Sequence, residues 1–153
     1  MEQNVLVTVE GLQRDGDGEE NRIELFTTGR YYNKNGVRYV SYDETEVSGM
    51  EGALTVLKLY PQRVVLLRMG KIQQKQEFIP DHKSHSLYVT PYGTMDMAVD
   101  TAELAVQVIR EGDAAEPLLL QVTVRYELEI DGRRQSSNIL SITIQGERRK
   151  HGY

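Results

Sequence analysis

The stretch Leu118-Leu119-Leu120-Gln121-Val122-Thr123-Val124-Arg125-Tyr126-Glu127-Leu128-Glu129-Ile130-Asp131-Gly132 decides the fold of this chain. From Leu120 to Ile130 every second residue is apolar or aromatic, and the residues between are polar or charged. Successive residues of a β-strand point to opposite faces, so this pattern predicts one long strand with a buried face and a solvated face. Asp131-Gly132 then supplies the positive φ angles of a tight turn. The chain returns with Asn138, Leu140, Ile142 and Ile144 on one face, which completes a hairpin.

The rest of the chain repeats this period of two. Alternating segments lie at 5–10, 23–31, 37–42, 54–59, 64–69, 72–79 and 86–90. Turn formers separate them, including 13–19, Asn35-Gly36, Tyr60-Pro61-Gln62 and Pro91-Tyr92-Gly93. About nine or ten strands with short turns are typical of an all-β barrel or sandwich. Because strands this long and half-buried favour closure, which removes exposed edges, we expect an all-β fold: a single antiparallel barrel of about 8–10 strands.

The segment 95–109 permits two interpretations. Its first part alternates through Met95, Met97 and Val99, and its second part through Leu104, Val106 and Val108. A helix over 101–110 is the competitor, because Asp100 could cap it and Glu103 stands three residues further on. The alternation favours a strand.

Composition bounds the class of protein. The 153 residues predict one domain, which we place at 1–147, followed by a basic tail at 148–153. Cysteine is absent, the N-terminal residues do not resemble a signal peptide, and no apolar run is long enough to span a membrane. These features predict a cytoplasmic protein without a membrane partner. The net charge of −5 argues against a nucleic-acid partner, and the basic run Arg148-Arg149-Lys150-His151 is expected to be a solvated tail.

Four segments are distinctive beyond their periodicity. They are Tyr39-Val40-Ser41-Tyr42-Asp43-Glu44-Thr45-Glu46-Val47-Ser48-Gly49, Leu67-Arg68-Met69-Gly70, Tyr88-Val89-Thr90-Pro91-Tyr92-Gly93 and Ser136-Ser137-Asn138-Ile139-Leu140-Ser141-Ile142. In this order, over nearly the whole chain, they resemble the YwiB-like family of small bacterial proteins, a domain of unknown function. The resemblance implies a calycin-like, lipocalin-shaped barrel in the bacterial cytosol. It implies no activity, catalytic residue or ligand, and the small hydrophobic ligands of calycin barrels bear on this chain only by analogy of fold.

One polar group is predicted inside the barrel. Tyr42 and Glu44 share a strand face with Val40, so they point inward if Val40 does. A buried carboxylate needs a partner, and Arg68, on the face of Val64 and Leu66, offers a planar fork that matches it. Tyr88 is expected to point inward from a nearby strand, where it adds a hydroxyl. This cluster either orients a small ligand or is a satisfied internal pair that sets strand register.

Other candidates are weaker. Tyr92, on the rigid Pro91-Tyr92-Gly93 turn, either covers the barrel mouth or packs on a neighbouring strand. His82 and His85 are expected in a loop beside Pro80, with too few neighbouring ligands for a metal site. No nucleophile motif or phosphate-binding loop is present, so we expect no catalytic residues and no cofactor.

Three classes of function remain open. A barrel that binds a small hydrophobic or amphipathic molecule at Tyr42, Glu44, Arg68, Tyr88 and Tyr92 requires an open-ended cavity of roughly 300 Å³ or more. A protein-interaction or structural module, such as a homodimer, requires apolar patches outside the barrel, for example around Phe26 or Leu119. An enzyme that uses Glu44 and Tyr42 requires a carboxylate in an accessible pocket, and it ranks last.

Overall fold

The computed structural model describes residues 2–113 and 115–147, so the predicted basic tail at 148–153 lies outside the described residues. Within them the chain forms ten strands and no helix, which confirms the all-β prediction. The strands are β1 Gln3–Asp15, β2 Glu20–Lys34, β3 Val37–Asp43, β4 Ala53–Tyr60, β5 Arg63–Gly70, β6 Gln74–Phe78, β7 His82–Thr90, β8 Gly93–Arg110, β9 Leu119–Ile130 and β10 Arg133–Gly146. In the described ranges no helix has the length and apolar character needed to cross a membrane.

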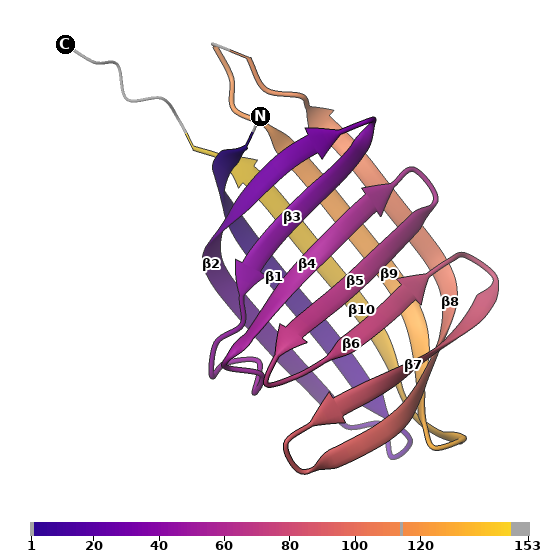
Figure 1. Ribbon diagram of the computed structural model, residues 1–153. Helices are drawn as coiled ribbons and strands as arrows, with labels where there is room; N and C mark the ends of the chain where they lie inside the picture. Colours follow the sequence, from indigo (N-terminus) through magenta and orange to yellow (C-terminus); the bar gives the residue numbers. More distant parts are fainter. Residues whose placement is uncertain (1, 114, 148–153) are drawn as a thin grey trace.

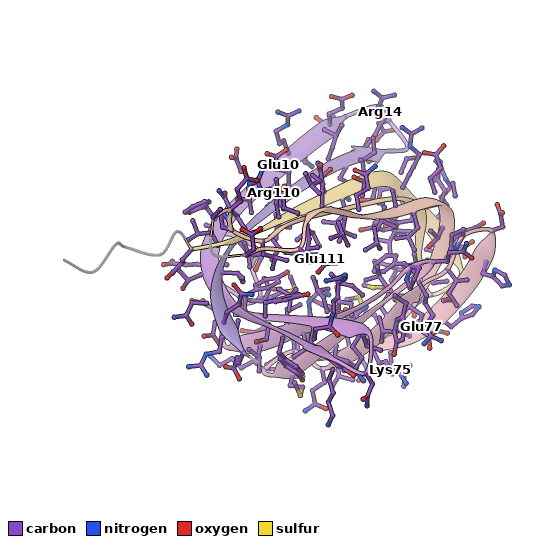
Figure 2. All side chains as sticks on the ribbon, turned by 90° about the horizontal axis from the view of Figure 1, so that it is seen from above. Glu10, Arg14, Lys75, Glu77, Arg110 and Glu111 are labelled. Carbon is purple, nitrogen blue, oxygen red and sulfur yellow. The ribbon has the colours of Figure 1, made fainter. Side chains whose placement is uncertain are left out.

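All ten strands belong to one antiparallel sheet, in the order β6-β5-β4-β3-β2-β1-β10-β9-β8-β7. The first and last strands pair in the middle of this order, and β6 and β7 lie at its two ends. Figure 1 shows the sheet curling until these ends meet, and Figure 2, from above, shows the strands as a ring. Gln73 and Val89 join the ends by two backbone hydrogen bonds, with N–O distances of 3.0 and 2.9 Å. The predicted closed barrel is therefore confirmed as a nearly closed one, and we call the β6–β7 junction the seam.

The hairpin of β9 and β10 forms as its alternation predicts. Val122 pairs with Ile142 and Leu120 with Ile144, and all four side chains are at most 2% exposed. Asp131 and Gly132 have φ angles of 50° and 81°, as a turn matched to the right-handed twist of the flanking strands requires. The strand face predicted to be buried is the inner face of the barrel.

The ambiguous segment 95–109 is strand throughout, within β8. The pairing with β9 shifts between Thr101 and Glu103, where Ala102 forms a bulge. A bulge adds one residue to a strand, so the inward positions change from odd numbers, as at Val99, to even numbers, as at Leu104. This change of phase explains why the apolar pattern also suits a helix.

The expectation of a loop at His82 and His85 is wrong. β7 begins at His82, which pairs with Thr101, and it continues the β7–β8 ladder past His85. Both imidazoles are exposed, and residues three apart on a strand point to opposite faces. The Pro80 that suggested a loop instead precedes a single left-handed residue, Asp81, with φ 63°.

The two ends of the barrel differ. The upper end in Figure 1 carries the β2–β3 and β4–β5 turns and the β8–β9 connection. Here the interior is filled by apolar side chains, among them Val5, Leu59, Val64, Leu118 and Ile144. The lower end carries the β1–β2 and β9–β10 turns and the loop at 44–52 between β3 and β4. Polar side chains enter the interior at this end.

Candidate functional site: a polar chamber at the lower end of the barrel

Glu44 and Arg68 lie together inside the barrel, as predicted. The Glu44 side chain is 2% exposed and that of Arg68 is 16% exposed, with 3.7 Å between Arg68 Nε and Glu44 Oε2. At this distance the two groups form an ion pair but no hydrogen bond. The Thr55 hydroxyl donates a hydrogen bond to Glu44 Oε2 instead. The carboxylate is thus held on β4, and the Arg68 Nε–H lies near it without a hydrogen bond.

The pair is part of a chain of polar contacts that crosses the interior. Arg68 Nη1 donates to Gln74 Oε1 at 2.6 Å, and Gln74 Nε2 donates to the Ser86 hydroxyl at 3.1 Å. That hydroxyl donates to Gln76 Oε1 at 2.8 Å. We call this set the polar belt; its members are Glu44, Thr55, Arg68, Gln74, Gln76 and Ser86. Because Gln74 and Gln76 are on β6 and Ser86 is on β7, the belt closes the seam with side chains.

Two buried polar atoms near the belt have no hydrogen-bond partner among the described residues. They are Arg68 Nε and the hydroxyl oxygen of Thr101, whose residue is fully buried. Buried polar groups in proteins nearly always have a partner, so each exception calls for an explanation. The Arg68 Nε–H is the more costly of the two, because it belongs to a charged group.

Tyrosine side chains lie around the belt. Tyr42 is 5% exposed, and its burial, reinforced by the Glu44 carboxylate, raises its pKa above the usual value, although Arg68 and Thr55 act in the opposite direction. Burial likewise raises the pKa of Tyr126 on β9, against the effect of Arg68. Both phenols are therefore neutral at ordinary pH. They supply polar contacts without adding charge.

The other two predicted tyrosines lie apart from the belt. Tyr88 is half-buried on β7 and shares the strand phase of Ser86, but among the described residues its hydroxyl makes no hydrogen bond to the belt. Tyr92 is 99% exposed at the β7–β8 turn. It neither covers the barrel mouth nor packs on a neighbouring strand, because the two-residue turn directs it into solvent. Tyr42, Glu44 and Arg68 are thus brought together, and Tyr92 is not.

A cavity of about 180 Å³ lies beside the belt at the lower end. We call it the chamber. Its polar lining includes Glu44, Arg68, Tyr126 and Asn138, and its apolar lining includes Val9, Leu25, Met50, Leu66, Leu140 and Ile142. The chamber is smaller than the roughly 300 Å³ expected, because core side chains fill the upper half of the barrel.

The chamber is bounded on one side where β2 leaves β3. These strands pair only from Arg30–Ser41 to Lys34–Val37, and residues 20–29 of β2 pair with β1 alone. Figure 2 shows the β1–β2 hairpin near Arg14 leaning away from the ring. Ile23, which is 44% exposed, and Ser48 of the 44–52 loop both line the chamber. The chamber therefore reaches solvent between this half of β2 and the loop.

Several site residues were not predicted. Gln74 and Gln76 point into the barrel, on the same strand face as Ile72 and Phe78, and Lys75 and Glu77 point outward. Two polar residues on an otherwise apolar strand face were the sequence feature that could have indicated this site. Gly11 lines the chamber in the middle of β1, and no atom lies within 4 Å of the position its Cβ would take. A glycine inside a strand often marks a close approach by another group. Here the open position enlarges the chamber.

The upper end of the barrel is closed by a second polar contact that was not predicted. Arg38 on β3 donates to the Tyr31 hydroxyl at 2.8 Å and binds both carboxylate oxygens of Glu111. The hydrogen bonds from Arg38 lower the pKa of Glu111. Glu111 follows β8 directly, so this contact ties the β8–β9 connection to β3.

Metal ligands do not gather in the described part of the chain, where no three His, Cys, Asp or Glu side chains lie close enough to hold an ion. The chemistry that the chamber offers is hydrogen bonding. Arg68 supplies a charged donor group, the neutral phenols supply polar edges, and Val9, Leu25 and Leu140 supply apolar contact.

Comparison with known proteins agrees with this fold. A family model described as a domain of unknown function, DUF1934, matches residues 7–142. The chain belongs to the DUF1934 family. It is 23% identical over 132 residues to the uncharacterized beta-barrel protein YwiB of Bacillus subtilis (strain 168). The aligned residues cover 86% of this chain and 87% of that protein. The crystal structure of the ywiB protein from Bacillus subtilis superposes with a TM-score of 0.81, over 95% of this chain and 93% of that one, at 23% identity. The predicted YwiB-like family is confirmed, and at this identity the structural match supports the shared barrel.

Proposed function

We propose that the barrel binds a small, neutral, amphipathic molecule in the chamber, in the cytoplasm of a bacterial cell. The observation that carries the proposal is Arg68, which lines the chamber and whose buried Nε–H has no acceptor among the described protein groups. An unpaired buried donor costs about 1–3 kcal/mol. A ligand atom that accepts this hydrogen bond recovers that cost.

The charges around Arg68 favour a neutral ligand. Within the belt, one carboxylate, Glu44, already faces the one guanidinium. A ligand carboxylate would place a second negative charge beside Glu44 in a poorly solvated site, which is unfavourable. A carbonyl or amide oxygen accepts a hydrogen bond from Arg68 without that repulsion.

The volume and the apolar wall define the rest of the ligand. A chamber of about 180 Å³ is too small to enclose a whole lipid or other long-chain molecule, which favours a compact ligand. Its apolar side, formed by Val9, Leu25 and Leu140, matches a compact hydrocarbon body. Gly11 supports this assignment, because a larger residue there would occupy the same space. The calycin-like shape that the family resemblance implies would add support by analogy of fold.

A matched pair of probes tests the proposal. We expect ε-caprolactam, a neutral lactam, to shift the amide resonances of residues around Gly11, Arg68 and Leu140 in a ¹H–¹⁵N spectrum. Hexanoate has the same number of non-hydrogen atoms but carries a carboxylate, and we expect it to bind more weakly. Equal binding of the two probes would contradict the neutral ligand, and binding of neither would contradict the site.

A variant that fills the chamber provides the control. In Gly11→Leu the new side chain enters open space, so we expect a folded barrel that no longer binds the lactam. Gly16→Leu makes the same change at the exposed β1–β2 turn and should bind as the parent does. Lactam binding retained in Gly11→Leu would place the ligand elsewhere. Native mass spectrometry of the protein from its own host would then give the mass of the natural ligand.

A further inference from the structure

The second half of β8 is an open sheet edge. β7 pairs with β8 only from Gly93 to Thr101. Residues 103–108 and Arg110 pair with β9 on one side, and on the other side no strand of the described chain pairs with residues 102–110. Val108 and Ile109 are 40% and 51% exposed there. The barrel wall is therefore incomplete beside this half of β8.

The backbone groups at this edge can be identified from the register. Thr90 and Gly93 flank a two-residue turn, so the odd-numbered residues of β8 up to Thr101 direct their backbone groups toward β7. The bond from the Asp81 N–H to the Thr101 carbonyl agrees with this assignment. Beyond the Ala102 bulge the phase changes, so Leu104, Val106 and Val108 direct their N–H and C=O groups to the open edge.

This edge lacks the protection that natural edges carry. Exposed edge strands are usually guarded by charges, proline or short length. The open half of β2 follows that rule, with exposed Glu20, Arg22 and Glu24. In contrast, the segment from Leu104 to Ile109 reads Leu-Ala-Val-Gln-Val-Ile and contains no charged residue. An unguarded apolar edge of this kind is a site for strand addition.

We propose that this edge pairs with the same edge of a second copy of the chain, as an antiparallel dimer about a two-fold axis at Val106. The pairing sets Leu104 opposite the partner's Val108, and Ala105 opposite the partner's Gln107. The residues that direct their N–H and C=O groups to the open edge then lie opposite one another in the two copies. The two barrels share one continuous sheet, and the half-exposed apolar side chains at the edge become covered.

The charges at the ends of the segment favour this partner. Glu103 stands at one end and Arg110 at the other. Antiparallel pairing about Val106 sets Glu103 opposite the partner's Ile109, next to the partner's Arg110. A second register shift between Val108 and Arg110 puts Arg110 on the same outer face as Glu103, and the symmetry repeats the contact. Arg110 is held at the edge by its contacts with the Pro117 carbonyl, at 3.2 Å, and with Glu116, at 3.5 Å. Cross-strand pairs of opposite charge stabilise a sheet, and like charges destabilise it.

A charge exchange tests the dimer. Sedimentation equilibrium of the full chain should show a monomer–dimer equilibrium, and Glu103→Arg should weaken it about tenfold, because two arginines then meet at each end. Glu103→Arg combined with Arg110→Glu should restore association. Glu103 is exposed and pairs with Arg125 on β9, so the single variant should keep the fold and lose only a little thermal stability of the monomer, which melting at a monomeric concentration measures separately. Glu24→Arg, on the other open edge, makes the same change in net charge and should have no effect.

Each contrary result overturns the proposal. A parent chain that stays monomeric over the whole accessible concentration range excludes the dimer. A dimer that Glu103→Arg leaves intact, or that the double exchange fails to restore, excludes this edge. A dimer weakened by Glu24→Arg instead places the interface on β2. Salt dependence that is equal for all variants would indicate nonspecific association.

Discussion

At the scale of the residue, the interior of this barrel depends on a few polar side chains that are only partly paired. Glu44 accepts a hydrogen bond from Thr55, and its Oε2 lies 3.7 Å from Arg68 Nε. Arg68 Nη1 donates to Gln74. Burial raises the free-energy cost of any group left without a partner. Arg68 therefore neutralises a buried carboxylate, and under the proposed function it also donates a hydrogen bond to the ligand.

Arg68→Leu should lower the free energy of unfolding by about 3–5 kcal/mol, because it leaves the Glu44 carboxylate buried and unpaired. The double variant Glu44→Gln with Arg68→Met removes both charges and should lose clearly less. Urea unfolding followed by circular dichroism measures both. Arg14→Leu breaks an exposed ion pair with Glu20 and serves as the control, with no measurable loss expected. Equal losses for the single and double variants would show that Arg68 contributes through packing instead of charge.

The buried Tyr42 phenol predicts a loss of stability at alkaline pH. Its pKa is raised in the folded barrel, mainly by burial and then by Glu44, whereas an unfolded tyrosine titrates near pH 10. Above about pH 10 the unfolded chain therefore releases a proton that the folded chain retains, and stability falls as pH rises. In Tyr42→Phe the slope of unfolding free energy against pH should be shallower above that point and unchanged at pH 7–9. The same slope in the variant and the parent would contradict a raised pKa.

At the scale of the element, bulges and changes of strand pairing limit how much of the fold could be predicted from the sequence. The hairpin of β9 and β10 was predictable because its alternation and its turn agree. β8 was ambiguous because the Ala102 bulge changes the inward phase, and no local residue type announces a bulge. The seam was not predictable, since Gln74 and Ser86 meet across strands whose pairing depends on closure of the whole sheet. Glu44 and Arg68 were predictable as a pair, because a buried carboxylate requires a cation.

The close approach of β2 to β3, at the point where the two strands begin to pair, depends on Gly29. A Cβ at this position would lie 2.5 Å from the Ser41 carbonyl oxygen and 3.0 Å from a Val7 methyl. Because the Ser41 oxygen is part of the backbone, Gly29→Ala should force the strands apart and lower the free energy of unfolding by about 1–3 kcal/mol. Thermal unfolding measures the loss. Gly11→Ala, in the neighbouring strand, meets no atom and should not destabilise the barrel. A Gly29→Ala variant as stable as the parent would show that the contact relaxes without cost.

At the scale of the whole molecule, the barrel is strong in the middle of the sheet and weak at the seam. The first and last strands pair through eleven residue pairs, from Val5–Gly146 to Asp15–Ser136. The seam has a single backbone bridge, Gln73–Val89, supported by the polar belt. Local opening needs least free energy where few backbone bonds must break, so the seam should open before the rest of the barrel.

Ser86→Ala tests this ranking. It removes the hydroxyl that joins Gln74 to Gln76 and leaves both amide groups short of a partner inside the barrel, which costs about 1–3 kcal/mol. Because the loss falls on the seam, the Gln73 and Val89 amides should exchange hydrogen roughly five- to a hundredfold faster under native conditions. The Val122 and Ile142 amides, in the middle of the sheet, should change much less. Ser137→Ala, which removes a hydroxyl bonded to Glu127 on the outer face, is the control and should leave the seam amides unchanged. Acceleration by an equal factor in both regions would mean that the barrel opens only as a whole, and that the belt stabilises the fold without holding the seam.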